Sequence, residues 1–251
     1  MSDVLNSKNG LDPQLVLGAY SVGVFPMADS RDAASVYWVE PRRRAVLPLD
    51  GFQLSRSLRK TIAADRFQVT VDTAFERVVQ LCAESVEGRP ETWINDGIER
   101  VFQTLHAMGF AHSVECWDGG KLVGGLYGLS LGRAFFGESM VSRATDASKV
   151  ALAHLVARLK AGGFDLLDCQ FQTSHLESLG AIEIERADYI ALLAAALDGV
   201  VGSTGSSGAA ASLAATGDFF ALDRAAAGAP DDAVSGPVAG KVIAQLLVQT
   251  S

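Results

Sequence analysis

The sequence predicts an α+β fold in which a small N-terminal lobe precedes one larger domain. Three stretches with strand-like patterns follow one another between short turns, at residues 112–117, 121–131 and 134–141. Strands joined by such tight turns indicate an antiparallel meander. A helical stretch and then a short buried apolar stretch, residues 164–170, come directly after it. The order of meander, helix and strand predicts one closed core unit.

Helix-start signals mark three helices ahead of the meander. The stretch Asp12–Tyr20 opens with an aspartate and a proline, the pattern of an N-cap and a first helical turn. Thr73–Glu76 has the spacing of a capping box, which predicts a helix to about Glu84. Asn95 is expected to cap a third helix, whose apolar residues recur at helical spacing until Gly109.

The helix after the meander is expected to begin at Thr145 or Asp146, either of which can cap it. Apolar residues at helical spacing then continue to a Gly162–Gly163 stop. The apolar stretch Phe164–Gln170 is expected to form a buried strand.

These elements predict three segments. Residues 1–66 form the N-terminal lobe, residues 67–198 the larger domain, and residues 199–251 a Gly/Ser/Ala-rich linker and tail. The composition of residues 199–217 is typical of a flexible linker because it lacks a periodic apolar face. Phe219, Phe220 and Val242–Val248 are expected to dock on the body, the last of them as either a helix or a strand.

Composition limits the classes of protein. The 251 residues include no secretory leader and no run of about 20 apolar residues, so we expect a soluble, cytoplasmic protein with no membrane partner. Three scattered cysteines indicate neither a disulfide framework nor a zinc site. The net charge of −8 argues against a non-specific nucleic-acid coat. However, residues 31–66 hold eight basic and four acidic residues, a pattern that suits either an RNA contact or a solvated face.

Two carboxylates interrupt apolar strands and are candidates for chemistry. Glu138 lies within the third strand of the meander and Asp168 within the buried strand after the helix, close to the polar Gln170. A buried charge requires either a partner or a function, and two of them with an adjacent amide favour a site. His175 follows the same strand, although a surface or helix-cap role suits it better.

The order of meander, helix and strand resembles the core of acyl-CoA N-acetyltransferases. That fold binds the coenzyme pyrophosphate on backbone amides at the start of the helix after the meander. The matching loop, residues 142–149, contains no glycine and places Asp146 near the helix start, so we expect an acyl donor other than a coenzyme A thioester.

A series of short motifs runs along residues 11–197, in the order Tyr20-Ser-Val-Gly-Val-Phe-Pro26, Trp38-Val-Glu-Pro-Arg42, Arg44-Ala-Val-Leu-Pro48, Ser55-Arg-Ser-Leu-Arg59, Thr92-Trp-Ile94, His112-Ser-Val-Glu115, Val123-Gly-Gly-Leu-Tyr-Gly128, Phe136-Gly-Glu-Ser-Met140, Ala147-Ser-Lys149, Asp168-Cys-Gln170 and Ser178-Leu-Gly-Ala181. In this order the motifs resemble those of the leucyl/phenylalanyl-tRNA-protein transferases. Each is short, and the resemblance rests on the number of them in register.

The resemblance implies a set of site residues. The apolar pocket for the aminoacyl side chain would be formed by Leu126, Phe135, Met140, Leu155 and Leu167, with Glu138 at its rim. The same five residues suit an ordinary core equally well. The terminal adenosine would be held by Trp38 and Trp93, and the tRNA acceptor stem by a basic helix with Arg56, Arg59 and Lys60.

The resemblance also implies the reaction. Leucine or phenylalanine, and in some cases methionine, would pass from aminoacyl-tRNA to the N-terminal Arg or Lys of an acceptor protein, which marks that protein for degradation. An aminoacyl ester is already activated toward amines, so no ATP, metal or other cofactor is expected, and positioning supplies most of the rate. Asp168 and Gln170 would act as a catalytic pair assisted by Glu138.

Two other functions compete with this interpretation. An acetyltransferase-like enzyme with another small acyl donor would need a glycine-containing loop at residues 142–149, which is absent. A non-catalytic adaptor that binds RNA or protein N-termini would not need the Asp168 and Gln170 pair, which is present.

Overall fold

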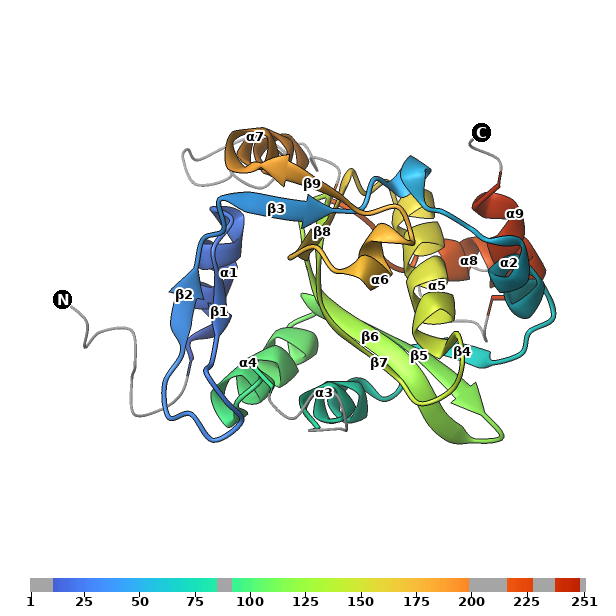
Figure 1. Cartoon of the computed structure of the whole chain (residues 1–251), viewed down its shortest axis with the longest axis horizontal. Helices are drawn as coiled ribbons and strands as arrows, with labels where there is room; N and C mark the ends of the chain where they lie inside the picture. The colour runs from blue at the N-terminus through green and yellow to red at the C-terminus, as the bar shows by residue number, and fades with distance from the viewer. Residues whose placement is uncertain (1–10, 85–91, 199–215, 228–237, 249–251) are drawn as a thin grey trace, which may run out of the picture.

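The computed structural model describes residues 11–84, 92–198, 216–227 and 238–248 (Figure 1). Its centre is a seven-stranded sheet with the strand order β4-β5-β6-β7-β8-β3-β9. All neighbouring strands are antiparallel except β7 and β8, which are parallel. The strands are β3 (Arg43–Val46), β4 (Gln68–Val71), β5 (Ala111–Asp118), β6 (Lys121–Leu131), β7 (Ala134–Ser142), β8 (Leu166–Gln170) and β9 (Ile182–Glu185).

The predicted α+β class and the meander are confirmed. Strands β5, β6 and β7 pair in sequence order, and the turn between the first two uses Gly119 and Gly120, both with positive φ. Helix α5 (Ala147–Ala161) then crosses back, and β8 runs parallel to β7. The parallel pair follows because a helical crossover returns the chain in its starting direction.

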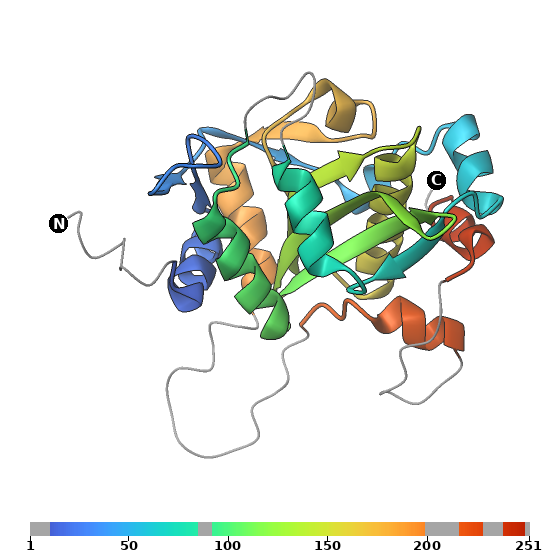
Figure 2. The ribbon, with the colours of Figure 1, turned by 90° about the horizontal axis from the view of Figure 1, so that it is seen from below.

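Helices cover both faces of the sheet (Figure 2). One face carries α5, which is buried along most of its length because α2 (Arg56–Ala63), α8 (Ala221–Ala227) and α9 (Gly240–Leu246) pack on it in turn. The other face carries α1 (Pro13–Ser21), α3 (Phe75–Ala83), α4 (Asp96–Ala107) and α7 (Arg186–Leu197). Two apolar cores result, one on each face.

Side chains cap two helices as expected. The Asp12 side chain accepts a hydrogen bond from the Gln14 N–H at 2.9 Å, and Asn95 accepts one from the Ile98 N–H at 2.9 Å. Each satisfies a backbone donor that has no partner inside its helix.

One predicted cap is wrong, and another residue lies at its predicted cap position without the expected hydrogen bond. Helix α3 has Ala74 at its N-cap position, because the Thr73 hydroxyl donates instead to the Val71 carbonyl at 3.2 Å. At the start of α5, Asp146 occupies the N-cap position with a φ of 67° and makes no capping hydrogen bond. Its carboxylate pairs with Lys149 at 3.2 Å, so a local ion pair replaces the expected cap.

The first 66 residues contribute to two sheets. Strands β1 (Phe25–Met27) and β2 (Tyr37–Val39) form a separate two-stranded sheet beside α1, at the left of Figure 1. Strand β3 instead joins the main sheet between β8 and β9. The chain between β3 and β4 holds the short 3₁₀ helix η1 (Leu49–Gly51) and α2, both of which contact α5.

The described part of the tail docks on the body, as predicted. The Phe219 ring stacks on the rings of His112 and Phe135, with centroids 4.2 and 5.6 Å apart. Of the two alternatives for Val242–Val248, the structure shows a helix, α9, to Leu246. The expected linker, residues 199–217, lies outside the described residues except for its last two positions. Among the described helices none has the length and apolarity to cross a membrane.

Candidate active site

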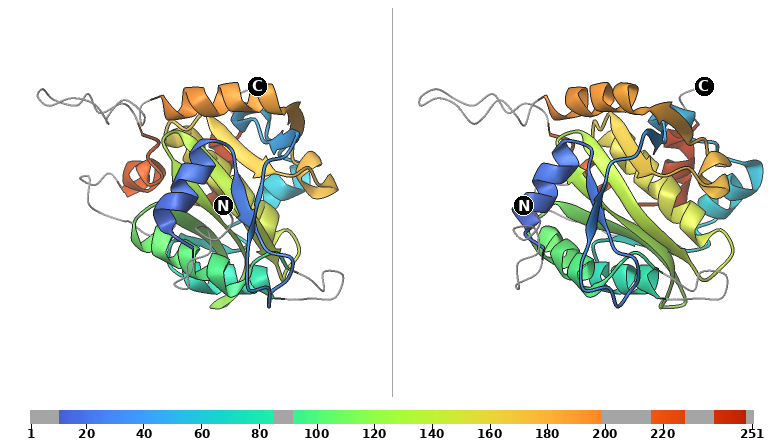
Figure 3. Two further views of the ribbon diagram at one scale, coloured as in Figure 1. Left: turned by 90° about the vertical axis from the view of Figure 1, so that its left-hand side faces the viewer. Right: turned by 60° about the vertical axis from the view of Figure 1, so that its left-hand side comes forward.

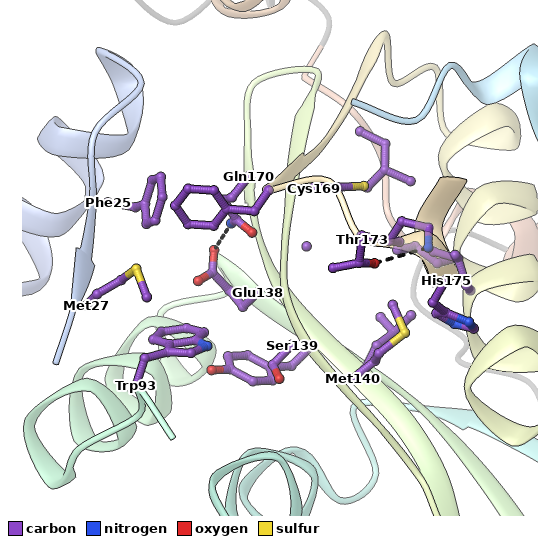
Figure 4. Close-up of a pocket in the computed structure, with 18 residues that line it drawn as sticks. Phe25, Met27, Trp93, Glu138, Ser139, Met140, Cys169, Gln170, Thr173 and His175 are labelled. Atoms are coloured by element: carbon purple, nitrogen blue, oxygen red, sulfur yellow. Dashed lines mark hydrogen bonds between the residues drawn. The ribbon is translucent and has the colours of Figure 1, made fainter. Parts of the chain in front are cut away.

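A cavity of about 270 Å³ opens where β7 and β8 separate, next to the first turns of α5 (Figure 4). Strands β6 and β7 form its floor, and α5 and the short helix α6 (Ser174–Glu177) form one wall. Phe25, Met27 and Trp93 close the opposite side. The lining is mostly apolar, with a few polar groups, as is usual for a small-ligand pocket.

Four of the five predicted pocket residues line this cavity, namely Leu126, Met140, Leu155 and Leu167. Phe135 is not among the residues that line it. Its ring is fully buried between Phe164 and Phe219, with centroids 6.5 and 5.6 Å away, on the side of β7 that faces the tail.

Asp168 is fully buried and holds an ion pair with Arg44 that the sequence analysis did not include. The Arg44 Nε lies 2.9 and 3.0 Å from the two carboxylate oxygens, and Nη2 lies 2.6 Å from Oδ2. The Tyr189 hydroxyl of α7 donates to Oδ2 at 2.8 Å, and the Gln170 N–H donates to Oδ1 at 2.8 Å. With these donors, the Asp168 carboxylate has little hydrogen-bonding capacity left for a substrate.

Aromatic rings hold the Arg44 guanidinium from two sides. Its central carbon lies 4.6 Å from the centroid of Phe25 and 4.6 Å from that of Tyr189. The Nη1 group donates to the Gly23 carbonyl at 3.0 Å. Stacked between rings and with a hydrogen-bond partner at each of its three nitrogens, the buried arginine is stabilised despite its desolvation. The only sign of this in the sequence is an arginine directly before the apolar run Ala45–Leu47.

Gln170 is the polar residue that Asp168 positions. Its φ is 56°, in the left-handed region that non-glycine residues rarely adopt. The hydrogen bond from its N–H to Asp168 helps hold that strained conformation at the end of β8. The side chain therefore leaves the strand toward the cavity, where Nε2 donates to Glu138 Oε1 at 3.0 Å (Figure 4).

Glu138 is the carboxyl group that lines the cavity. Burial, and secondarily the negative charge of Asp168, raise its pKa from 4.5 to about 8, against the opposing effects of Tyr20, Arg44 and Gln170. Burial and the adjacent Glu138 likewise raise the pKa of Tyr20. The cavity thus contains one amide and one carboxyl group that is largely protonated at neutral pH.

Cys169 and His175 also line the cavity, as do the hydroxyl-bearing Ser139 and Thr173. Burial raises the pKa of the Cys169 thiol, so a nucleophilic thiolate is disfavoured. Burial, together with the positive charge of Lys149, lowers the pKa of His175. Among the described residues no cluster of His, Cys, Asp or Glu has the composition of a metal site.

The remaining predicted residues lie apart from one another. Trp93 lines the cavity, whereas Trp38, in β2, packs at the edge of the core formed by α1, α3 and α4. Helix α2, which lies to the right of α5 in Figure 1, exposes Arg56, Arg59 and Lys60. Strand β1, which carries Phe25, lies to the left of α5 in the same view. The structure therefore gathers Glu138, Gln170, Trp93 and four apolar residues at one cavity.

This arrangement defines an acyltransferase-like enzyme: a meander, a helix and a parallel strand, with a cavity where the two parallel strands separate. The family model of leucyl/phenylalanyl-tRNA protein transferases matches residues 46–194, and the model of that family's N-terminal domain matches residues 9–42. The chain belongs to this family, which makes it an aminoacyltransferase.

Similar proteins carry the same description. A leucyl/phenylalanyl-tRNA--protein transferase of Rhizorhabdus wittichii is 61% identical over 96% of this chain and 99% of its own length. One of Zymomonas mobilis is 60% identical over 75% of this chain and 70% of its own. A solved structure of L-PGS from Bacillus licheniformis is 12% identical, with a TM-score of 0.38 over 67% of this chain and 55% of that one, a likeness too weak to bear on function.

Proposed function

We propose that this chain transfers leucine or phenylalanine, and in some cases methionine, from aminoacyl-tRNA to the N-terminal Arg or Lys of acceptor proteins in the cytoplasm, marking them for degradation. The observation that carries the proposal is the apolar cavity that contains Gln170 and Glu138. Membership of the transferase family supports it, and disfavours both a different small acyl donor and a non-catalytic adaptor.

The cavity suits the side chain of the aminoacyl group. Leu126, Met140, Leu155 and Leu167 offer apolar walls to an unbranched, branched or aromatic side chain and no partner for a charged one. A hydrophobic pocket of this kind discriminates by only about 1–3 kcal/mol per methylene. Acceptance of leucine, phenylalanine and methionine together is therefore expected.

The transfer depends more on the positioning of the reacting groups than on acid or base catalysis. The acceptor amine attacks the ester carbon, the new C–N bond forms, and the C–O bond to the ribose breaks. The amine loses one proton in this step, and the departing ribose oxygen gains one. The Gln170 amide uses its nitrogen to donate to Glu138, so its oxygen is the acceptor offered to the attacking N–H. Because an amide is a weak base, we assign Gln170 to orienting the amine.

Asp168 acts through Gln170. It is fully buried and is not among the residues lining the cavity, and its contact with Gln170 is to the backbone N–H. We therefore assign it as a positioning residue that, with Arg44 and Tyr189, fixes the left-handed turn from which the Gln170 side chain projects. In this role Asp168 supports the pair with Gln170 without touching the amine itself.

Glu138 is the group proposed to select the acceptor. Its carboxyl group faces the cavity, whereas Asp168 is neutralised by Arg44. A lysine or arginine side chain close to Glu138 would favour the ionised carboxylate and lower its pKa. The adenosine end of the donor is proposed to rest on Trp93 and Trp38, and its acceptor stem on Arg56, Arg59 and Lys60.

The test is transfer of labelled leucine from charged tRNA to a protein that begins with arginine. We expect transfer to that protein and none to an otherwise identical one that begins with serine. Gln170→Ala should lower turnover at least about a hundredfold, a typical loss for a residue acting in the transition state, with little change in donor affinity. The matched control Gln68→Ala alters an exposed glutamine of β4 and should retain wild-type turnover. Wild-type turnover in the Gln170 variant would exclude the assigned role.

A further inference from the structure

Helix α9 lies beside the basic helix α2, as Figures 1, 2 and 3 agree. The two pack along each other, and both also contact α5. Ile243, Ala244 and Leu247 of the C-terminal segment share one apolar cluster with Leu58 and Ile62, the two buried residues of α2. The inner face of the basic helix is thus covered by a segment that lies about 180 residues later in the chain.

Gly240, the first residue of α9, makes this contact unusually close. A Cβ atom at that position would overlap the carbonyl oxygen of Ile62, in the last turn of α2. The Gly240 N–H also donates to Asp65 Oδ1 at 2.6 Å, and Asp65, with a φ of 47°, lies just beyond the end of α2. Backbone therefore meets backbone here, and the start of α9 is fixed to the end of α2.

The outer face of α2 carries its charge. Arg56, Arg59 and Lys60 are exposed, and no ion pair within the described part of the chain involves them. The neighbouring cations already form ion pairs: Arg66 pairs with Asp118 at 2.7 Å, and Lys160 pairs with Asp50 at 2.9 Å. The helix is short, at eight residues, and buries only Leu58 and Ile62, so its orientation depends on its neighbours.

We propose that α9 is a positioning element for the donor tRNA, which holds α2 in the orientation that presents its three cations to the acceptor stem. The inference rests on the proposed function and adds to it a role for the tail. Both family models end before this helix, whereas the 61% identical relative is matched over 96% of the chain. The positioning role of α9 is thus inferred from the packing of this chain and not from the family.

The experiment compares two glycine substitutions that differ only in what the new methyl group meets. Gly240→Ala forces α9 away from Ile62, whereas Gly18→Ala in α1 adds a methyl group with no atom within 4 Å. A second pair acts on the other partner. Asp65→Gly removes the acceptor for the Gly240 N–H without straining the positive φ, and Asp65→Asn retains an acceptor oxygen.

Each variant is assayed with leucyl-tRNA and with leucyl-adenosine, which has no acceptor stem. For Gly240→Ala and Asp65→Gly, we expect the KM for leucyl-tRNA to rise roughly tenfold, as for the loss of one or two phosphate contacts, and the salt dependence of tRNA binding to flatten. Their kcat, and every parameter with leucyl-adenosine, should stay near wild type. Gly18→Ala and Asp65→Asn should match wild type throughout.

Two results would overturn the proposed positioning role of α9. Unchanged KM and salt dependence in Gly240→Ala and Asp65→Gly would show that α2 needs no help from α9. An equal loss of transfer activity with leucyl-tRNA and with leucyl-adenosine would show that α9 only stabilises the fold. Direct binding of uncharged tRNA separates this inference from the proposed function. If the wild-type protein transfers no amino acid but binds tRNA in a way that depends on α9, the transfer proposal fails while the positioning role of α9 is retained.

Discussion

At the scale of single residues, the two buried carboxylates differ in what surrounds them. Asp168 receives hydrogen bonds from Arg44, Tyr189 and the Gln170 backbone. Glu138 has one amide donor and no comparable cation contact, so burial dominates and raises its pKa to about 8. Two residues of similar chemistry thus divide into a carboxylate paired with an arginine outside the cavity and a titrating carboxyl group inside it.

The raised pKa of Glu138 predicts a pH-dependent stability. A carboxyl group whose pKa is higher in the folded state contributes stability that is fully present below its ordinary pKa of 4.5 and is lost as pH rises through about 8. Because glutamine does not ionise, Glu138→Gln removes this loss of stability at high pH. We therefore expect the variant to melt at the wild-type temperature at pH 4.5 and above the wild-type temperature at pH 9, by at least about 2–4 °C, which corresponds to 1 kcal/mol in a chain of this size.

Thermal melts across this pH range provide the check, with Glu177→Gln as the control on an exposed carboxylate of α6. Glu177→Gln should follow the wild-type curve at every pH. A Glu138→Gln variant that is no more stable than wild type at pH 9 would mean that the carboxylate is well solvated or paired there, contrary to its burial.

Phe135 and Leu155 provide a second comparison at residue scale, because one lies in the core and the other in the cavity wall. Phe135→Ala is expected to cost roughly 3–5 kcal/mol of unfolding free energy and to leave the preference between leucine and phenylalanine unchanged. Leu155→Ala should enlarge the cavity and shift preference toward phenylalanine by up to tens of fold. Competition between the two charged tRNAs, alongside denaturant melts, measures both effects, and a preference shift in the Phe135 variant would return that residue to the pocket.

At the scale of helices and strands, the sequence predicted those elements whose signals are local. The meander, α4 and α5 show their periodicity and end signals within a few residues. Strand β3 was not predicted, because Arg44 interrupts its apolar pattern and finds its carboxylate partner 124 positions away. Helix α7 was also not predicted. Its buried residues recur at helical spacing, but alanine and leucine also occupy its exposed sides, so no single apolar face marks it in the sequence. A residue such as Arg44, whose partner is distant in the sequence, gives no periodic signal.

The charged face of α2 predicts a salt effect on binding. Arg56→Ala combined with Arg59→Ala should weaken tRNA binding regardless of the tRNA body sequence and reduce the slope of log K against log salt by roughly one per lost phosphate contact. Turnover at saturating donor should be spared, since neither residue lines the cavity. Arg100→Ala, on the exposed side of α4, is the control. If the double variant keeps the wild-type slope, α2 is an ordinary solvated helix.

At the scale of the whole molecule, the tail joins parts of the fold that are distant in sequence. Helix α8 packs on α5, and Phe219 stacks on His112 of β5 and Phe135 of β7. The Arg158 side chain in α5 forms a buried ion pair with Asp223 of α8. Because both charges are almost completely removed from water, their pairing ties the tail to the central helix.

This ion pair predicts that the described tail unfolds together with the body. Asp223→Ala leaves the Arg158 guanidinium buried without its carboxylate, which should cost about 3–5 kcal/mol. Replacing both partners, as Arg158→Met with Asp223→Leu, removes the uncompensated charge and should recover most of that loss. Urea unfolding followed by tryptophan fluorescence and by circular dichroism measures these proteins. The single variants Arg158→Met and Asp223→Leu complete the double-mutant cycle, which gives the coupling between the two residues. A single shared transition in wild type is expected, because Arg158 belongs to the central helix. If Asp223→Ala unfolds at the wild-type midpoint, the tail is only loosely attached and contributes nothing to the stability of the core.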